Sequence, residues 1–258
     1  MKPPRSNQTA KRPRRKMSGN TPEGERRGRV TRPEKASSEN QRQLTKKVKT
    51  AKGRKLSSKL WIERQINDPY VARAQAEGWR SRAAFKLQEI DDKHRILRPG
   101  MLVADLGSAP GGWSQVAVRR GAANVVGIDL IAVDPIEGTT QLQADFTDED
   151  AGERVMALLG AKPQLVMSDL AANTTGHKQT DHLKTIALVD AAVDFAFHNL
   201  APGGAFVAKV FQGGTTNETL RRLQTHFKTV KHFKPESSRK GSPEIYLVAL
   251  DYKPTPAD

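Results

Sequence analysis

The sequence contains no cysteine among its 258 residues. Disulfide bonds and thiolate metal sites are therefore excluded, and a reducing compartment is permitted. Long hydrophobic runs are also missing, since no stretch approaches the roughly 18 apolar residues of a membrane-spanning helix. The start of the chain lacks the apolar core of a secretory signal. These absences favour a soluble, cytoplasmic protein.

Acidic residues are scarce at the N-terminal end. Residues 1–55 hold 19 Lys and Arg against 4 Glu, whereas the rest of the chain holds 24 basic and 24 acidic residues, so this segment carries the whole net charge of +15. It has too few apolar side chains to form a core. We expect a disordered basic tail at 1–55 that contacts RNA phosphates, followed by one folded domain at 56–258. A solubilising or targeting segment is the alternative.

From residue 56 onward, apolar strand-like segments alternate with helix-like segments. Strands are expected at 101–106, 124–130, 141–145, 164–169, 205–211, 229–234 and 244–250. Helices are expected at 57–66, in one or two pieces within 70–97 with a break at Gly78, and at 113–120, 148–160, 182–200 and 215–227. The nine residues 235–243 are too few for a parallel crossover, so the last two strands should form an antiparallel hairpin. The pattern predicts an α/β fold with a doubly wound, mostly parallel seven-stranded sheet.

A glycine-rich loop, Gly107-Ser-Ala-Pro-Gly-Gly112, follows the first expected strand. Glycine lets a ligand approach the backbone closely, and the N–H groups of the next helix favour a negative group. The spacing differs from the G-x-G-x-x-G of nicotinamide oxidoreductases, and no P-loop lysine follows. The strand, loop and helix resemble the S-adenosylmethionine site of class I methyltransferases. An ordinary βα turn is the alternative.

Polar residues stand at the ends of several expected strands. Asp129 is placed to accept hydrogen bonds from ribose hydroxyls, with a turn aspartate as the alternative, and Asp145 could face a base edge. Lys209 interrupts an apolar strand and would lose hydration there, so we expect it at the mouth of the sheet beside carboxylates, with an edge strand as the alternative. Arg80 and Arg82 belong to a basic helical region at 73–98, which we expect to hold RNA phosphates unless it is simply a solvated face.

From about Leu60 to its end, the chain resembles the FtsJ/RlmE family of ribosomal RNA (uridine-2′-O)-methyltransferases. The matching segments are Arg80–Leu87, Asp105–Gln115, Val166–Asp169, Leu200–Gly204, Val207–Gly213 and Ser237–Tyr246. This family usually has Ala-Pro-Asn where the chain has Ala171-Ala172-Asn173.

The resemblance implies a Rossmann-like methyltransferase that uses S-adenosyl-L-methionine and no metal. It implies a monomer that acts on large-subunit 23S ribosomal RNA or the 50S ribosomal subunit, at the A-loop uridine, and so supports ribosome maturation. It places a catalytic tetrad at Lys86, Asp169, Lys209 and Glu244. It also places cofactor contacts at Gly111, Trp113, Asp129, Asp145 and Asp169.

The residue types suit the implied reaction. A ribose 2′-hydroxyl must give up its proton as it attacks the methyl group, and a lysine beside a second cation can accept it. Our hypothesis is that Lys209 is the base, that Asp169 and Glu244 orient it, and that Lys86 helps to fix the target nucleotide. The alternatives are methylation of tRNA or another ribosomal RNA position, and a non-catalytic RNA-binding assembly factor.

Overall fold

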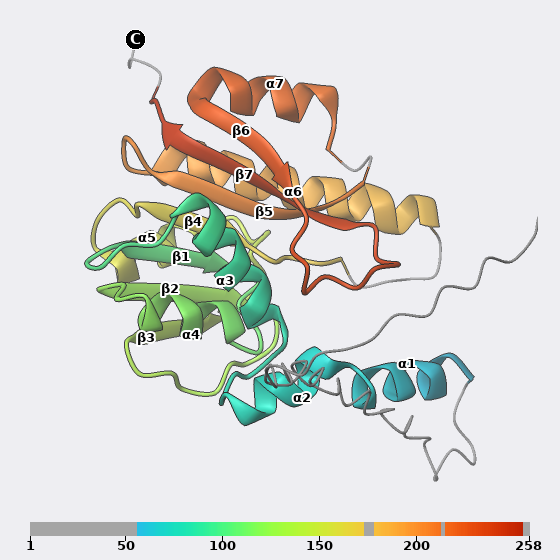
Figure 1. Cartoon of the computed structure of the whole chain (residues 1–258). Helices are drawn as coiled ribbons and strands as arrows, with labels where there is room; N and C mark the ends of the chain where they lie inside the picture. The colour runs from blue at the N-terminus through green and yellow to red at the C-terminus, as the bar shows by residue number, and fades with distance from the viewer. Residues whose placement is uncertain (1–55, 173–177, 213–214, 255–258) are drawn as a thin grey trace, which may run out of the picture. The chain divides into compact units, whose positions relative to one another are not determined.

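The computed structural model describes residues 56–172, 178–212 and 215–254, so the expected tail at 1–55 lies outside the described residues. Two helices precede a third that leads into the sheet, and the strands and helices then alternate (Figure 1). The helices are α1 (Leu56–Ile66), α2 (Pro69–Ala76), α3 (Ala83–His94), α4 (Gly112–Arg119), α5 (Ala151–Leu159), α6 (Lys178–Asn199) and α7 (Asn217–His226). The strands are β1 (Leu102–Leu106), β2 (Asn124–Asp129), β3 (Thr139–Gln143), β4 (Leu165–Ser168), β5 (Ala205–Phe211), β6 (Phe227–Phe233) and β7 (Glu244–Tyr252).

The described strands form one sheet in the order β3-β2-β1-β4-β5-β7-β6. The first five strands are parallel, and β7 runs antiparallel to both β5 and β6. This arrangement confirms the doubly wound sheet and its C-terminal hairpin. Because β7 inserts between β5 and β6, it lies inside the sheet, and β6 forms the edge.

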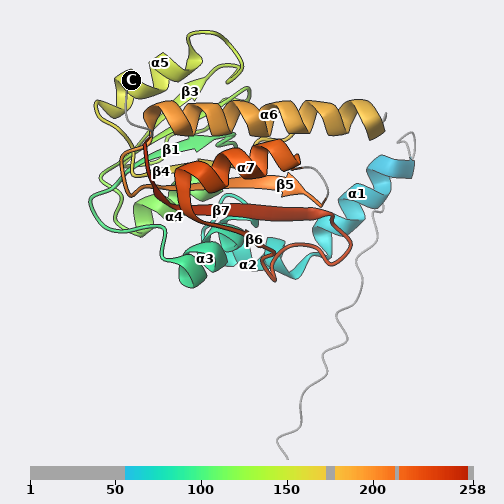
Figure 2. The same ribbon diagram turned by 90° about the horizontal axis from the view of Figure 1, so that it is seen from above.

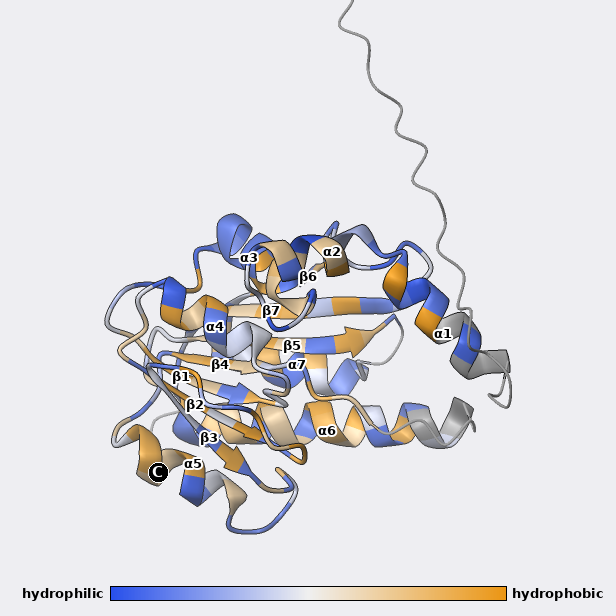
Figure 3. Cartoon of the chain, turned by 90° about the horizontal axis from the view of Figure 1, so that it is seen from below, coloured by the Kyte–Doolittle hydropathy of each residue, from blue (hydrophilic) through white to orange (hydrophobic). Residues whose placement is uncertain are grey.

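The sheet is covered on both faces. Figure 2 shows α5, α6 and α7 on one side and α3 and α4 on the other. Each face has its own apolar core, one centred on Val126, Phe206 and Leu200 and the other on Leu87, Met167 and Val207. The central strands are hydrophobic along most of their length (Figure 3), as expected for parallel strands that are buried on both faces.

Local sequence signals account for the helices that precede the sheet. The Asp68 side chain accepts a hydrogen bond from Tyr70 N–H and caps α2, with Pro69 at the first helical position. Gly78, with a φ of 72°, lies between α2 and α3, where the sequence suggested a break. This turn sets the start of α3 beside the N-terminal end of α4, and the two helices pack together.

Candidate active site

The glycine loop packs tightly at the end of β1. Gly107 has a φ of 82°, and a Cβ there would lie 2.9 Å from Leu170 N. Gly111 has a φ of 103°, and a Cβ there would lie 2.5 Å from Ile136 Cδ1. Both positions favour glycine because their φ angles are positive. A side chain at Gly107 would also meet the main chain after β4, and one at Gly111 would meet a side chain of the β2–β3 connection.

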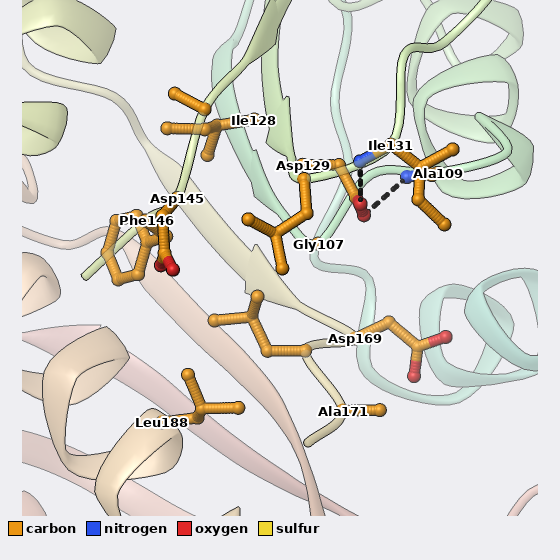
Figure 4. Close-up of a pocket in the computed structure, with 13 residues that line it drawn as sticks. Gly107, Ala109, Ile128, Asp129, Ile131, Asp145, Phe146, Asp169, Ala171 and Leu188 are labelled. Carbon is orange, nitrogen blue, oxygen red and sulfur yellow. Dashed lines mark hydrogen bonds between the residues drawn. The ribbon is translucent and has the colours of Figure 1, made fainter. Parts of the chain in front are cut away.

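A cavity of about 350 Å³, which we call the first cavity, opens beside this loop. It lies beyond the carboxyl ends of the parallel strands, where ligands bind in doubly wound sheets. Its lining includes Gly107, Ile128, Asp129, Asp145, Phe146 and Asp169 (Figure 4). Leu130 and Ile131 also line it and are 55% and 68% exposed. A bound ligand would cover this apolar surface.

Two aspartates of the first cavity are held by backbone N–H groups. Asp129 Oδ2 accepts from Ala109 N at 2.9 Å, and Oδ1 accepts from Ile131 N at 2.9 Å (Figure 4). Asp145 Oδ1 accepts from the hydroxyl and the N–H of Thr147, and these bonds lower the pKa of Asp145. Both carboxylates are therefore fixed as acceptors at the ends of β2 and β3.

A third carboxyl group, Asp105, lies in β1 and is fully buried. Its Oδ2 accepts a 2.6 Å hydrogen bond from Ser114 Oγ, while Oδ1 has no hydrogen-bond partner among the described residues. Burial raises the pKa of Asp105 to about 7 despite the bond from Ser114, and the charges of Asp169 and Asp129 push it further upward.

The structure brings Lys209 and Asp169 together. Lys209 lies in β5 opposite Tyr246 of β7 and is 8% exposed. Strand β4 ends at Ser168, which pairs with Ala208, so the next residue of β5 reaches past the end of β4. Lys209 Nζ donates to Asp169 O at 2.6 Å and lies 3.1 Å from Asp169 Oδ1. The lysine thus lies at the mouth of the sheet beside a carboxylate.

Lys86 and Glu244 form a second ion pair nearby. Lys86 Nζ of α3 lies 2.6 Å from Glu244 Oε1 at the start of β7, and both side chains are largely buried. Ser238 Oγ also donates to Glu244 Oε1, at 3.3 Å. Two residues that are 158 positions apart in the chain therefore meet because the C-terminal hairpin packs against α3.

Tyr246 joins the two ion pairs, and the sequence analysis gave it no role. Its hydroxyl lies 3.1 Å from Asp169 Oδ1, 3.0 Å from Glu244 Oε1 and 3.1 Å from Lys86 Nζ. Burial and the two carboxylates raise the pKa of Tyr246 well above its usual range, so the phenol keeps its proton. A signal was present, because Tyr246 follows Glu244 by two residues and so shares its face of the strand.

We call these five side chains (Lys86, Asp169, Lys209, Glu244 and Tyr246) the polar cluster. A phenol carries one proton, so Tyr246 donates to one carboxylate at a time and accepts from Lys86. The two lysines and two carboxylates balance in charge. Asp169 also lines the first cavity, so the cluster borders a ligand-sized space.

Gly111 and Trp113 lie apart from the residues that line the first cavity. Gly111 is the N-cap of α4, and Trp113 is in the first turn of that helix. The Trp113 indole is buried, donates to Ala83 O at 2.9 Å and packs against the Tyr246 ring. The Gly111 N–H donates to Ser108 O at 2.6 Å. A ligand contact at these two positions would therefore use the main chain, with the Trp113 N–H as donor instead of the indole, and stays a prediction.

Arg80 and Arg82 have internal partners that the sequence analysis missed. The Arg80 guanidinium donates to Asp134 O at 2.6 Å and to Pro135 O at 2.7 Å, which ties the β2–β3 connection to the start of α3. Arg82 donates to Asp68 Oδ2 at 2.6 Å and to Ser237 O. Both arginines hold loops together, so charge reversal there would disturb the fold as well as any RNA contact.

Three further features bear on function. The described residues contain no group of three or more His, Asp or Glu that could hold a metal ion. Within the same part of the chain, no helix has the length and apolar character needed to cross a bilayer. Ala172, which replaces the proline of the FtsJ/RlmE pattern, follows Ala171 of the first cavity, while Asn173 lies outside the described residues.

The sheet order, the glycine loop and the cavity at the strand ends define a Rossmann-like methyltransferase. The chain belongs to the FtsJ-like methyltransferase family, whose model matches residues 79–252. It is 57% identical over 207 residues to Ribosomal RNA large subunit methyltransferase E of Granulibacter bethesdensis, covering 80% of this chain and 90% of that protein. It is 58% identical over 212 residues to the protein of the same name from Hyphomonas neptunium, covering 82% and 91%.

A solved structure supports the same assignment. The crystal structure of a putative ribosomal RNA methyltransferase from Plasmodium falciparum aligns with a TM-score of 0.61 and 29% sequence identity. The alignment covers 69% of this chain and all of that one. The fold is therefore shared with a ribosomal RNA methyltransferase.

Proposed function

We propose that this protein transfers a methyl group from S-adenosylmethionine to a ribose 2′-hydroxyl of large-subunit ribosomal RNA, at the A-loop uridine. The observation that carries the proposal is the polar cluster beside the first cavity. Relatives that share more than half of their aligned residues with this chain are named as ribosomal RNA large subunit methyltransferases, which supports an RNA substrate. The cytoplasm, where large subunits are assembled in bacteria, is the expected place of action.

The first cavity fits S-adenosylmethionine. Its volume of about 350 Å³ lies within the range of roughly 300 to 1,000 Å³ that is usual for small-molecule sites. Asp129 would accept from the ribose hydroxyls of the adenosine part, and Asp145 would face its base. The N–H group of Trp113 in the first turn of α4 would attract its carboxylate, and Gly111, whose own N–H donates to Ser108 O, would let the ligand approach the backbone closely. Asp169 would lie near its sulfur. When bound, the cofactor would supply a methyl group activated by a positive sulfur.

Lys209 is the proposed base. To act as the base, the Lys209 ammonium must first release a proton to solvent, and the neutral amine that results has two N–H groups and one lone pair. The two contacts of Lys209 with Asp169 occupy both N–H groups, which leaves the lone pair to accept the proton of the 2′-hydroxyl. General-base help of this kind contributes about 10²- to 10⁴-fold to a rate.

Asp169 and Glu244 keep the two amines in place, and Lys86 is proposed to contact the target nucleotide. Tyr246 holds the pairs at a fixed separation, since its hydroxyl contacts members of both. Fixed geometry matters here because the reaction is a direct displacement, in which the alignment of nucleophile and methyl carbon lowers the barrier most.

The test is a mapping experiment. Large subunits from bacterial cells that lack this enzyme are incubated with the full chain and S-adenosylmethionine, and ribose methylation is mapped by mass spectrometry. The expected result is one new 2′-O-methyl group, at the A-loop uridine. Methylation of tRNA or of another position would correct the substrate, and an unmodified RNA with correctly folded protein would overturn the proposal.

Cofactor choice is tested separately by thermal unfolding. S-adenosylmethionine at saturating concentration should raise the melting temperature, because it binds the folded state alone. NAD, which has an adenosine part but no sulfonium, serves as the matched control and should have little effect. Equal stabilisation by both would contradict the cofactor assignment.

A further inference from the structure

A second, smaller cavity of about 170 Å³ lies on the other flank of the polar cluster. It is lined by Gln65, Arg82, Lys86, Arg239, Ser242 and Glu244. These residues come from α1, α3, the β6–β7 connection and the start of β7, and Figures 1 and 2 both show that connection running beside α1 and α2. The two cavities have no lining residue in common. Asp169 of the cluster faces the first, and Lys86 and Glu244 face the second.

The second cavity carries an excess of positive charge. Its lining holds three cations and one carboxylate, and Lys86 already pairs with that carboxylate. Behind it, a single oxygen, Asp68 Oδ2, accepts from both Arg82 at 2.6 Å and Arg239 at 3.2 Å. Two guanidinium groups therefore share one counter-charge, which leaves one positive charge over. The cavity is suited to an anion.

Arg239 also has hydrogen-bonding capacity left. Its Nη2 is buried, yet it has no hydrogen-bond partner among the described residues, and the same holds for Arg82 Nε. Buried donors without acceptors are costly, and a guanidinium matches the oxygens of a phosphate well. The cavity is smaller than the roughly 300 Å³ at which sites for whole small molecules begin. It therefore suits one group of a larger ligand.

We propose that the second cavity binds the phosphodiester group next to the target ribose, with Arg239 as the direct ligand. The inference rests on the proposed function and adds a binding site to it. A phosphate held here would place the attached ribose at Lys86 and Glu244, and hence at the polar cluster. Asp68 is a positioning residue, because it orients Arg82 and Arg239 from behind the cavity.

The experiment compares three full-length variants on large subunits that lack the modification. Arg239→Gln removes the proposed ligand, Asp68→Asn removes the carboxylate but keeps both arginines, and Arg222→Gln is the matched control. Arg222 lies on α7 and, like Arg239, pairs with an aspartate. Their side chains are 39% and 37% exposed. KM and kcat are measured, along with subunit affinity over a range of salt concentrations.

Arg239→Gln should raise KM for the subunit about tenfold and lower the slope of log affinity against log salt by about one. Its affinity for S-adenosylmethionine should not change. Arg222→Gln should leave KM and slope at the wild-type values. Asp68→Asn should keep the slope, because no cation is lost. Arg239→Lys, which keeps the charge but not the fork of donors, should also keep the slope while KM rises several-fold.

Two results would overturn the inference. One is an unchanged KM and slope in Arg239→Gln. The other is an equal rise of KM in Arg239→Gln and Asp68→Asn, with the slope unchanged in both. Arg239 would then serve only to hold the β6–β7 connection in place. In either case the wild-type protein would still methylate the subunit. Failure of the proposed function would instead appear as a wild-type protein that methylates no ribose.

Discussion

The two cavities beside the polar cluster differ in the sign of their charge. The first is lined by Asp129, Asp145 and Asp169 and by no Lys or Arg among the described residues. The second is lined by three cations and one carboxylate. A methyl donor with a positive sulfur and an RNA chain with negative phosphates would each enter the cavity of opposite charge. The polar cluster would then lie where the two reactants meet.

The largest expected effect tests the cluster itself. Lys209→Met should lower kcat by about 10²- to 10⁴-fold, since it removes the proposed base but keeps the length of the side chain. The affinity for S-adenosylmethionine, measured by calorimetry, should stay near the wild-type value. Lys231→Met, on the exposed edge strand β6, is the control. A loss of less than about threefold would remove Lys209 from the role of base.

The next prediction concerns Asp105, the buried carboxyl group of β1. Folded Asp105 keeps its proton up to about pH 7, whereas the unfolded chain loses it near pH 4. The free energy of unfolding should therefore fall as pH rises from about 4 to 7, by up to about 4 kcal/mol from this group. Asp105→Asn mimics the protonated form and lacks this dependence.

Thermal unfolding of both proteins from pH 5 to pH 8 checks this. The wild type should lose stability relative to Asp105→Asn as pH rises, and the difference should level off above pH 7. A constant difference over that range would show that Asp105 is ionised in the folded protein.

A smaller effect, on cofactor affinity alone, should show that the two cavities bind different ligands. Asp129→Asn should weaken S-adenosylmethionine binding by about tenfold, because hydrogen bonds to a charged acceptor are worth about 1.5 kcal/mol or more. KM for the ribosomal subunit should not move. Asp148→Asn, at an exposed position after β3, is the control for loss of a negative charge. An equal rise in both constants would mean that the two cavities do not act separately.

The smallest effect is expected at the link between the two ion pairs. Tyr246→Phe removes one hydroxyl, while both lysine–carboxylate contacts can persist. We expect kcat to fall about three- to tenfold, equal to roughly 1 kcal/mol for a lost hydrogen bond, with KM and cofactor affinity unchanged. Steady-state kinetics and a thermal melt check this. If the melting temperature drops sharply while kcat stays constant, Tyr246 serves stability alone.

The fold class and most element positions were predictable because buried strands carry unbroken apolar runs, whereas the insertion of β7 between β5 and β6 was not predicted. The predicted bounds of β5 agree with the observed strand at both ends. Strand β3 was placed two residues too late, since its sequence is polar and its position is set by pairing with β2, where Asp129 faces Gln143. An edge strand with little burial leaves few local signals.

The candidate site was predictable as a set of residues but not as a set of contacts. Lys209 could be identified from the sequence because a charged side chain loses hydration inside an apolar strand and is unusual there. The partners of Arg80 were not predictable, because Asp134 and Pro135 offer main-chain oxygens, which every residue has. Tyr246 was missed because a tyrosine in a strand is ordinary, and its role depends on β7 lying beside β5.

The position of β7 inside the sheet has a consequence for how the protein is made. Translation reaches this strand after all the others, so a growing chain exposes an unpaired edge at β5 and still lacks Glu244 and Tyr246. Until the hairpin closes, Lys86 lacks its carboxylate partner Glu244, and the second cavity lacks the wall formed by Arg239, Ser242 and Glu244. The polar cluster is therefore complete only after the hairpin has been synthesised and β7 has paired with β5.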